Sequence, residues 1–374
     1  MKRLCAGALA VLFLLSGCKA DFFPQSREIE NMALMRTMGV DALEGGVAVT
    51  VSSGVQSKGP GEGSEPPQVF SQKARTVSGA CLAMQSEGDS YLFYGHVGQL
   101  LLGEEQARQD VTEALDYVER DLEMRLDTEF FVVKGGGAGE AISAVAKPDS
   151  AAVDRLEALE QDAGLTPATM PRTVKDVLAG LAQNGASFAP AIAISGSGEE
   201  KELRPAGYAV FRESTLVGWA EGEAARGINL VWGQTDADVL ELAVSNGEKL
   251  ALRLVSANTK VRPVFDGDNL VGLDLDCSVE ANVAQAPDGL SLEQGGELDT
   301  LRAALASTVQ GRVRRAVTVS QTLDADFLGL AKRAGLSAPW HWAAIKAQWE
   351  ERFVALPVNV RVEAKIERGY DLKG

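Results

Sequence analysis

Residues Tyr91–Val133, YLFYGHVGQLLLGEEQARQDVTEALDYVERDLEMRLDTEFFVV, carry the clearest strand–helix–strand pattern in the chain. Tyr91–Leu102 is an apolar run that stops at Gly103, which is typical of a strand. Glu104–Glu119 places apolar side chains at helical spacing and acidic residues in its first turn, where the helix dipole favours them. Glu129–Val133 is a second short strand. This spacing predicts a βαβ unit with a right-handed crossover.

The residues on either side of this unit add a strand, a loop and helices. Val47–Val51 alternates as a strand does and runs into Ser52–Pro67, whose Gly, Ser, Pro and Glu content indicates a long loop. Ser71–Gln85 is predicted as a short helix. Two further helices are predicted at Ala151–Asp162 and Pro171–Gln183, the second with its proline at the first helical position.

The composition shifts to Gly, Ser and Glu around Ser195–Glu200, and we predict a domain boundary there. Most of the chain beyond it has strand patterns joined by turns such as Asn246-Gly247 and Asp266-Gly267. The predicted strands are Gly207–Arg212, Leu216–Trp219, Val239–Val244, Leu250–Val255, Thr259–Phe265, Leu270–Ala284 and a strictly alternating final one at Val358–Ile366; the predicted helices are Glu297–Leu323 and Ala338–Phe353.

Overall composition limits the classes of partner. The chain has 374 residues, 45% hydrophobic and 24% charged, with a formal net charge of −16. These values are typical of a globular protein, and the excess of acids disfavours binding to nucleic acid or a polybasic grip on a membrane. Of the four cysteines, Cys81 and Cys277 lie far apart in the body of the chain. The sequence allows a disulfide between them, but two separate buried thiols are the favoured interpretation.

The N-terminus has the three parts of a lipoprotein signal. Lys2 and Arg3 precede an apolar run, Ala6–Leu15, that is too short to span a membrane stably. The run ends in Leu15-Ser16-Gly17-Cys18, a lipobox in which the Cys18 thiol accepts a diacylglycerol and small residues precede the cleavage point. Two or three acyl chains would hold the mature protein stably. An ordinary secretory signal that happens to contain a cysteine is the alternative.

No set of residues in the sequence forms a recognisable catalytic centre. His96 and His341 are the only histidines, and neither has acidic or thiol residues at ligand spacing. Gly135–Gly139 follows a strand but lacks the ending of a phosphate-binding loop, so a strand-to-helix turn is the better interpretation. Asp266–Asn269 resembles a piece of a calcium loop but is better explained as a hairpin turn. We therefore predict a non-enzymatic protein without a metal or cofactor.

Two short motifs allow either a structural or a binding role. Glu119-Arg120-Asp121 with Arg125 places opposite charges near a helix end, which favours a capping and ion-pair network over a binding site. Leu216-Val217-Gly218-Trp219 places a large ring beside a glycine, which favours sealing of a domain joint over contact with a partner.

Four groups of segments, in order behind the lipobox, are similar to the Ger(x)C family, the C subunits of nutrient germinant receptors in spore-forming bacteria. They are Arg27–Glu30 with Ala33-Leu34 and Gly39–Asp41; Leu102–Arg108, Leu115–Asp121, Met124–Leu126 and Phe131–Gly135; Ala209–Phe211, Leu216–Trp219 and Glu223–Gly227; and Asp324–Leu330 with Trp349, Phe353 and the final strand. The sequence departs from the family in lacking a Trp after the lipid cysteine and in the long insert Ser52–Pro67.

The resemblance implies a role and a location. Such C subunits assemble with a multi-spanning A subunit and a transporter-like B subunit, held by the Cys18 lipid in the bilayer on the outer face of the spore inner (cytoplasmic) membrane. It implies no catalytic residue. Two rival functions stay open, a solute-binding lipoprotein that delivers a ligand to a membrane transporter, and a lipoprotein enzyme that acts on cell wall.

The family architecture is α+β in three parts, which adds a boundary near Gly289 to the one near Ser195. We therefore expect a multi-domain mixed fold, with the βαβ unit in the N-terminal part and largely antiparallel strands with long helices in the C-terminal part. The expected division is a signal peptide at 1–17, a lipidated tether at 18–26, an N-terminal α+β domain at 27–195, a central β-rich domain at 196–289 and a C-terminal helix-plus-strand domain at 290–374.

Overall fold

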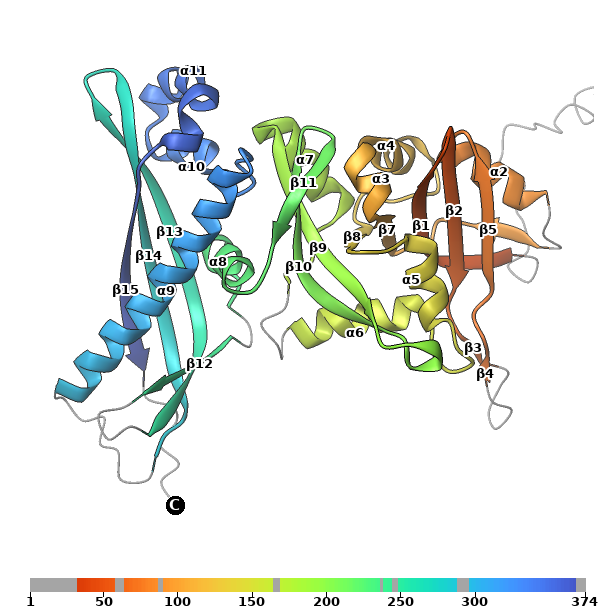
Figure 1. Ribbon diagram of the computed structural model, residues 1–374, viewed down its shortest axis with the longest axis horizontal. Helices are drawn as coiled ribbons and strands as arrows, with labels where there is room; N and C mark the ends of the chain where they lie inside the picture. Colours follow the sequence, from red (N-terminus) through yellow and green to blue (C-terminus); the bar gives the residue numbers. More distant parts are fainter. Residues whose placement is uncertain are drawn as a thin grey trace, which may run out of the picture.

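A computed structural model describes residues 32–57, 64–86, 90–163, 169–235, 238–243, 248–287 and 296–367. The lipobox with Cys18 lies outside the described residues, as do the predicted turn Asn246-Gly247 and Gly289. The described chain forms an elongated body with a nine-stranded sheet in one half and a four-stranded sheet in the other (Figure 1). The mixed α+β class predicted from the sequence is confirmed.

The larger sheet has the strand order β11-β10-β9-β8-β7-β1-β2-β5, with β6 beside β1. Its four central strands, β1, β7, β8 and β9, run parallel, and the outer strands pair antiparallel. Parallel strands are covered on both faces, which explains why β7 is buried along its whole length. The strands are β1 Met32–Leu43, β2 Gly46–Ser53, β5 Val69–Ala74, β6 Tyr91–Phe93, β7 Gln99–Gly103, β8 Glu129–Val133, β9 Ala186–Ser195, β10 Glu202–Arg212 and β11 Thr215–Ala220; β3 Gln56–Ser57 and β4 Ser64–Glu65 form a separate pair.

The predicted βαβ unit is present, but both its first strand and its helix are divided. Strands β7 and β8 are parallel, as expected. The predicted strand Tyr91–Leu102 is two strands, β6 and β7, which pair with successive parts of β1. The predicted helix is also two, α3 Glu104–Gln109 and α4 Thr112–Arg120, because Asp110 is extended and its carboxylate accepts hydrogen bonds from the Thr112 N–H and Oγ1. An aspartate side chain that accepts a hydrogen bond from the backbone N–H two residues later forms a turn, which competes with continuation of the helix.

Four more helices cover the larger sheet, α2 Val77–Gln85, α5 Ala138–Val145, α6 Ala152–Ala163 and α7 Val174–Asn184. The predicted helix Ser71–Gln85 begins too early, because Ser71–Ala74 pair with β2 as part of β5. Helix α7 begins after the predicted Pro171. Its start is set by a capping box, in which Thr173 Oγ1 accepts from the Asp176 N–H and the Asp176 carboxylate accepts from the Thr173 N–H.

The second half is a four-stranded sheet crossed by one long helix. Its order is β12-β13-β14-β15, with β15 parallel to β14 and the other pairs antiparallel. The predicted turn at Asp266-Gly267 joins β13 to β14, where Gly267 has a φ of 58°. The two strands predicted within 250–265 are one continuous strand. The elements are α8 Glu223–Trp232, β12 Val239–Ala243, β13 Lys249–Asp266, β14 Asn269–Gln285, α9 Gly296–Thr322, α10 Leu330–Ser337, α11 Trp342–Arg352 and β15 Val358–Glu367.

The two main sheets each run across one of the predicted domain limits. Residue 195 ends β9, yet β9 pairs along its length with β10, and β10 with β11, so the larger sheet continues to Ala220. The parts predicted as 196–289 and 290–374 share one sheet, because β15 pairs with β14 over ten residues. One hydrophobic core also extends from Phe188 and Tyr208 in the larger sheet to Val360 in the smaller one.

Candidate functional site

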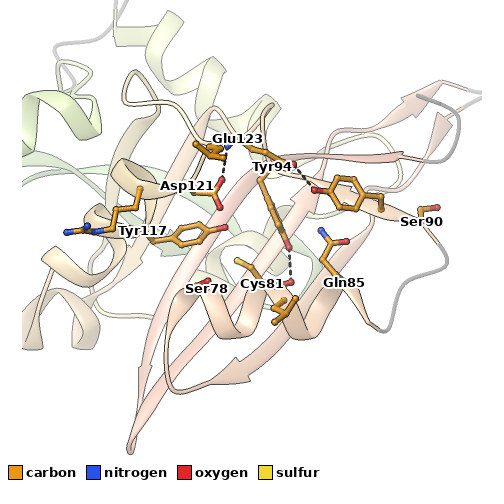
Figure 2. A pocket seen from close by; sticks show the side chains of 12 residues that line it. Ser78, Cys81, Gln85, Ser90, Tyr94, Tyr117, Asp121 and Glu123 are labelled. Atoms are coloured by element: carbon orange, nitrogen blue, oxygen red, sulfur yellow. Dashed lines mark hydrogen bonds between the residues drawn. The ribbon is translucent and has the colours of Figure 1, made fainter. Parts of the chain in front are cut away.

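A groove with a volume of about 810 Å³ lies between α2, β6 and the residues that follow α4. Figure 2 shows Tyr94 and Tyr117 pointing toward Cys81 on α2, with Asp121 and Glu123 along the opposite wall. A smaller hollow of about 340 Å³ adjoins it and shares four of its residues, Ser78, Tyr117, Arg120 and Asp121. A concave site of this size is large enough to hold a small molecule or a peptide side chain.

The acidic residues of the groove are already paired within the protein. Glu123 accepts hydrogen bonds from the Tyr91 hydroxyl at 2.6 Å and from the Tyr94 N–H at 3.1 Å. Asp121 Oδ1 accepts from the backbone N–H groups of Glu123 and Met124 at 2.9 and 3.3 Å. These bonds close the turn after α4 and tie it to β6. The two carboxylates therefore hold the wall of the groove in place.

Cys81 lies at the floor of the groove without the properties of a nucleophile. Its side chain is buried, and burial raises the pKa of the thiol to about 11. The Tyr94 hydroxyl donates to the Cys81 carbonyl, and burial also raises the pKa of Tyr94 and Tyr117 above their usual range. The thiol is the form present at neutral pH, and reactive cysteines require the thiolate. Cys277, in β14, is also free and buried, so the two body cysteines are separate thiols in different halves.

The predicted charge network around Arg120 is divided among separate contacts. Arg120 Nε donates to Asp116 Oδ1 at 2.6 Å, one helical turn earlier, and both side chains are more than half exposed. Arg125 pairs with Asp127 on the surface. Asp121 serves as a turn cap. The motif is structural, as the sequence favours, although Arg120 and Asp121 also line the groove. Exposed pairs of this kind contribute little to stability.

Two leucines stand at the rim of the groove with their side chains in solvent. Leu82 on α2 is 73% exposed and Leu122, just after α4, is fully exposed. Apolar rims with internally satisfied polar walls suit contact with another apolar surface better than chemistry on a bound substrate. Among the described residues there is no cluster of three or more His, Cys, Asp or Glu side chains that could hold a metal ion.

The glycine-rich turn at Gly135–Gly139 leads into a helix, as predicted, and the N-terminus of that helix is occupied by Asp41. The Asp41 carboxylate accepts from the Ala138 N–H at 2.6 Å and from the Gly139 N–H at 2.8 Å. A Cβ atom at Gly103 would lie 2.0 Å from Asp41 Oδ1, so that position requires glycine. A helix N-terminus attracts anions, and here the anion is supplied by the end of β1.

Both histidines are exposed and lie beside aromatic rings. His341 stacks on Phe265 with ring centroids 4.7 Å apart, and His96 lies 5.8 Å from the Phe93 ring. Contacts to tilted or stacked aromatic rings are ordinary packing. Within the described ranges, none of the helices is long and apolar enough to cross a membrane.

The second half contains buried charges between α8 and α9 that the sequence motifs do not reveal. Arg312 of α9 is 4% exposed, and its guanidinium donates to Glu223 at 2.8 Å and to Asp238 at 2.6 Å. Burial raises the pKa of Asp238 more than its arginine neighbours lower it. The one available signal is the position of Arg312 beside the apolar stripe of α9. Removing one partner of such a pair leaves a buried charge uncompensated.

A stack of aromatic rings and guanidinium groups crosses the joint between the two halves. The Arg172 guanidinium lies 4.6 Å from the ring centroid of Phe188 on β9 and 4.9 Å from that of Trp232 on α8. Arg333 of α10 lies 5.0 Å from the same Trp232 ring. Cation–π contacts of this kind are strengthened by desolvation. The joint therefore combines packed aromatic rings with buried guanidinium groups from both halves. This favours a fixed orientation of one half relative to the other.

Gly218, in the predicted joint motif, lies under the end of α9. A Cβ atom there would come 2.7 Å from Leu323 Cδ2. The neighbouring Trp219 is partly buried against the core of the larger sheet, with the Lys134 ammonium over its ring. The close approach at Gly218 favours the joint over a partner contact.

Comparison with known proteins finds family matches over most of the chain. Residues 25–194 match the family described as "Spore germination protein N-terminal domain", and residues 206–370 match "Spore germination B3/GerAC like, C-terminal". A spore germination protein of Bacillus subtilis (strain 168), YfkR, is 21% identical over 98% of this chain and 96% of its own length. The crystal structure of the GerBC protein superposes with a TM-score of 0.57 at 17% identity, covering 88% of this chain and 96% of that one, which shows a shared fold. The chain therefore belongs to the Ger(x)C family of spore germination proteins.

Proposed function

We propose that this protein is a lipid-anchored, non-enzymatic subunit of a membrane germinant receptor complex, required for nutrient-triggered spore germination. The observation that carries the proposal is the combination of two germination-family regions, 25–194 and 206–370, with the lipobox Leu15-Ser16-Gly17-Cys18 ahead of them. In this proposal the partners are the membrane-embedded A and B receptor subunits. The protein acts at the outer face of the spore inner membrane.

The proposed anchor keeps the body close to the bilayer. The predicted tether, 18–26, and residues 27–31 lie between the lipidation position and the start of β1 at Met32, and from here we call the whole segment 18–31 the tether. Fully extended, this tether reaches roughly 45 Å at 3.3–3.6 Å per residue. A thioether-linked diacylglycerol at Cys18 would supply the anchoring energy, because each buried methylene contributes about 0.8 kcal/mol.

The interior of the molecule supports a scaffolding role over catalysis. The groove acids Asp121 and Glu123 are occupied by backbone and tyrosine donors, and the Cys81 thiol is protonated. General acid–base or nucleophilic catalysis needs groups that can reach a substrate in the right protonation state. The joint stack of Arg172, Phe188 and Trp232 joins the halves into one extended body suited to contact several neighbours.

Deletion of the gene tests the proposed function. Spores without the protein are expected to lose dipicolinate release to at least one class of nutrient, and expression from a second locus should restore it. Normal release to every nutrient, in a strain without a paralogue, would contradict the proposal.

The solute-binding alternative is favoured only by the size of the groove, about 810 Å³. A ligand that binds only the native state stabilises it by RT ln(1 + L/Kd), where L is the free ligand concentration, so the melting temperature rises with the logarithm of that concentration once it exceeds Kd. Thermal scans of the mature chain with nutrient solutes should therefore show no shift under the receptor proposal. A shift that grows with ligand concentration in wild type and is lost in Tyr117→Ala would favour the alternative.

A further inference from the structure

The corner between α10 and α11 exposes three large apolar side chains. Leu336 is 72% exposed, Trp340 is 92% exposed and Trp342 is 40% exposed. These three side chains belong to a short stretch, 336–342, which we call the tryptophan corner. An indole in water loses the burial that normally stabilises it, so clusters of this kind mark contact surfaces.

The backbone of the tryptophan corner is held in place. The Ala338 N–H donates to the Ala334 carbonyl and the His341 N–H to the Ala338 carbonyl, both at 3.0 Å. The His341 ring stacks on Phe265 of the β13–β14 hairpin at an interplanar angle of 29°. The exposure of Trp340 is therefore imposed by an ordered turn.

The Trp342 side chain fixes the approach of α11 to α10. Its ring lies against Gly335, where a Cβ atom would come 2.2 Å from Trp342 Cε3. Glycine therefore allows the two helices to meet closely behind the corner. This leaves Trp340 and Leu336 as the projecting pair.

The charge around the corner is balanced in an otherwise acidic chain. Residues 330–355 carry four basic and two acidic side chains, and the facing hairpin tip adds Asp266 and Asp268. The sum is near zero, whereas the whole chain has a net charge of −16. This corner is therefore repelled by an anionic surface far less than the rest of the molecule. The charged residues of 330–355 are Lys332, Arg333, Lys346, Glu350, Glu351 and Arg352.

The corner lies on the same long edge of the molecule as α2 and α4. Figure 1 places α10 and α11 at one end of this edge and α2 and α4 toward the other. At that other end Met32, where the tether joins β1, pairs with Tyr91 of β6 beside the groove. The exposed Leu82 and Leu122 belong to α2 and to the residues after α4.

We propose that this edge rests on the lipid bilayer, with Trp340 and Leu336 inserted at the level of the headgroups. Tryptophan favours the membrane–water interface because its ring is apolar and its N–H still finds a partner there. The inference rests on the proposed membrane anchoring and extends it. The lipid on Cys18 holds one end, and the tryptophan corner holds the other, so the long axis lies along the membrane.

Quenching by brominated phosphatidylcholine vesicles tests this inference directly. The protein is the mature-length chain with Cys18→Ser, which cannot be lipidated. We expect its tryptophan fluorescence to be quenched by brominated but not by unbrominated vesicles, and the protein to sediment with both. Trp340→Ala with Leu336→Ala should lower the partition coefficient about tenfold, since a large apolar side chain no longer leaves water.

Val255→Ala is the matched control, because Val255 is an exposed apolar residue, 50% accessible, in β13 rather than in the corner. It should leave partitioning unchanged. Absence of quenching, or equal partitioning of the corner variant and wild type, would overturn the inference. So would corner-dependent retention seen only on membranes that contain receptor subunits, which would assign the corner to a protein partner. None of these outcomes depends on the Cys18 lipid or on germination, so they do not decide the proposed function.

Discussion

Asp41 connects three parts of the N-terminal half through one carboxylate. It lies near the end of β1, accepts from the Ala138 and Gly139 N–H groups at the start of α5, and lies against Gly103 at the end of β7. A carboxylate at this position both satisfies the first turn of a helix and interacts with its dipole. The sequence singles out the Gly39-Val40-Asp41 segment. It does not reveal that the helix start bound by Asp41 lies almost a hundred residues away.

Replacing this carboxylate should destabilise the fold measurably. We expect Asp41→Ala to lower the free energy of unfolding by about 1–2 kcal/mol, because two backbone donors lose their acceptor. Urea unfolding followed by circular dichroism measures the change. Asp127→Ala, which removes an exposed partner of Arg125, should change it by less than about 0.5 kcal/mol. Equal effects of the two variants would contradict the role given to Asp41.

Asp326 is a second buried carboxylate with a distinct pH signature. Burial raises its pKa from 3.8 to about 7, although it accepts from the Leu330 and Ala331 N–H groups and lies near Arg333. Since the folded-state pKa is raised, the unfolded chain releases this proton first as the pH rises. The stability that protonated Asp326 contributes is therefore present below about pH 4 and is lost as the pH rises to 7.

A comparison of wild type with Asp326→Asn isolates this effect. The stability of wild type relative to the variant should fall between pH 4 and pH 7, with a slope of at most about 1.4 kcal/mol per pH unit, and stay constant above pH 7. Urea titrations across this range measure the difference. A difference that rises with pH would show that Asp326 is ionised in the native protein.

At the scale of elements, the sequence pattern predicted the strands and helices whose burial follows their own alternation or helical spacing. Strand β15 alternates between buried and exposed residues as its sequence does, and Leu301, Leu305, Val309 and Val313 of α9 are buried on one face. Strand β1 was not predicted from its own pattern, because MALMRTMGVDAL has only two β-branched residues, Thr37 and Val40, and β9, ASFAPAIAIS, was not predicted at all. Both lie in the centre of the larger sheet, where tertiary pairing overrides weak local propensity.

The groove could not be predicted as a site for a related reason. Its walls come from α2, β6 and the turn after α4, and no single motif spans them. Arg120 and Asp121 were identified from the sequence, but as part of one charge network that the structure divides. The short motifs at Gly135–Gly139 and Asp266–Asn269 were correctly assigned to turns, because turn chemistry is set within a few residues.

Helices α8 and α9 cross so closely that one glycine is decisive. A Cβ atom at Gly227 would lie 2.1 Å from the Arg312 carbonyl oxygen, a backbone atom that cannot move away alone. We expect Gly227→Ala to destabilise the protein by about 1–3 kcal/mol through overpacking. Gly311→Ala is the control in the facing helix, since nothing lies within 4 Å of its added Cβ. That change should be neutral or stabilising by up to about 1 kcal/mol, and thermal unfolding distinguishes the two. A tolerated Gly227→Ala would contradict the close crossing.

At the scale of the whole molecule, two sheets are joined through one continuous core. Phe188 and Tyr208 of the larger sheet belong to the same hydrophobic cluster as α9 and the smaller sheet, and Arg172 is stacked between rings from both halves. A body without a loose linker at this joint transmits a force applied at one end to the other. In the proposed arrangement one end is tethered through Cys18 and the other bears the tryptophan corner. A subunit built this way would respond as a unit to movement of its membrane partners.

The central claim is that the lipid on Cys18 anchors a germination protein whose body acts at the membrane. The most direct measurement is nutrient-triggered dipicolinate release from spores carrying Cys18→Ala at the native locus, beside wild type, the deletion and Cys5→Ala. Cys5 is the matched control, because it lies in the signal segment ahead of the lipobox. We expect Cys18→Ala spores that still make the protein to lose release to the same nutrients as the deletion, while Cys5→Ala spores behave as wild type. Normal release in Cys18→Ala spores, with the deletion defective, would contradict the anchored mechanism.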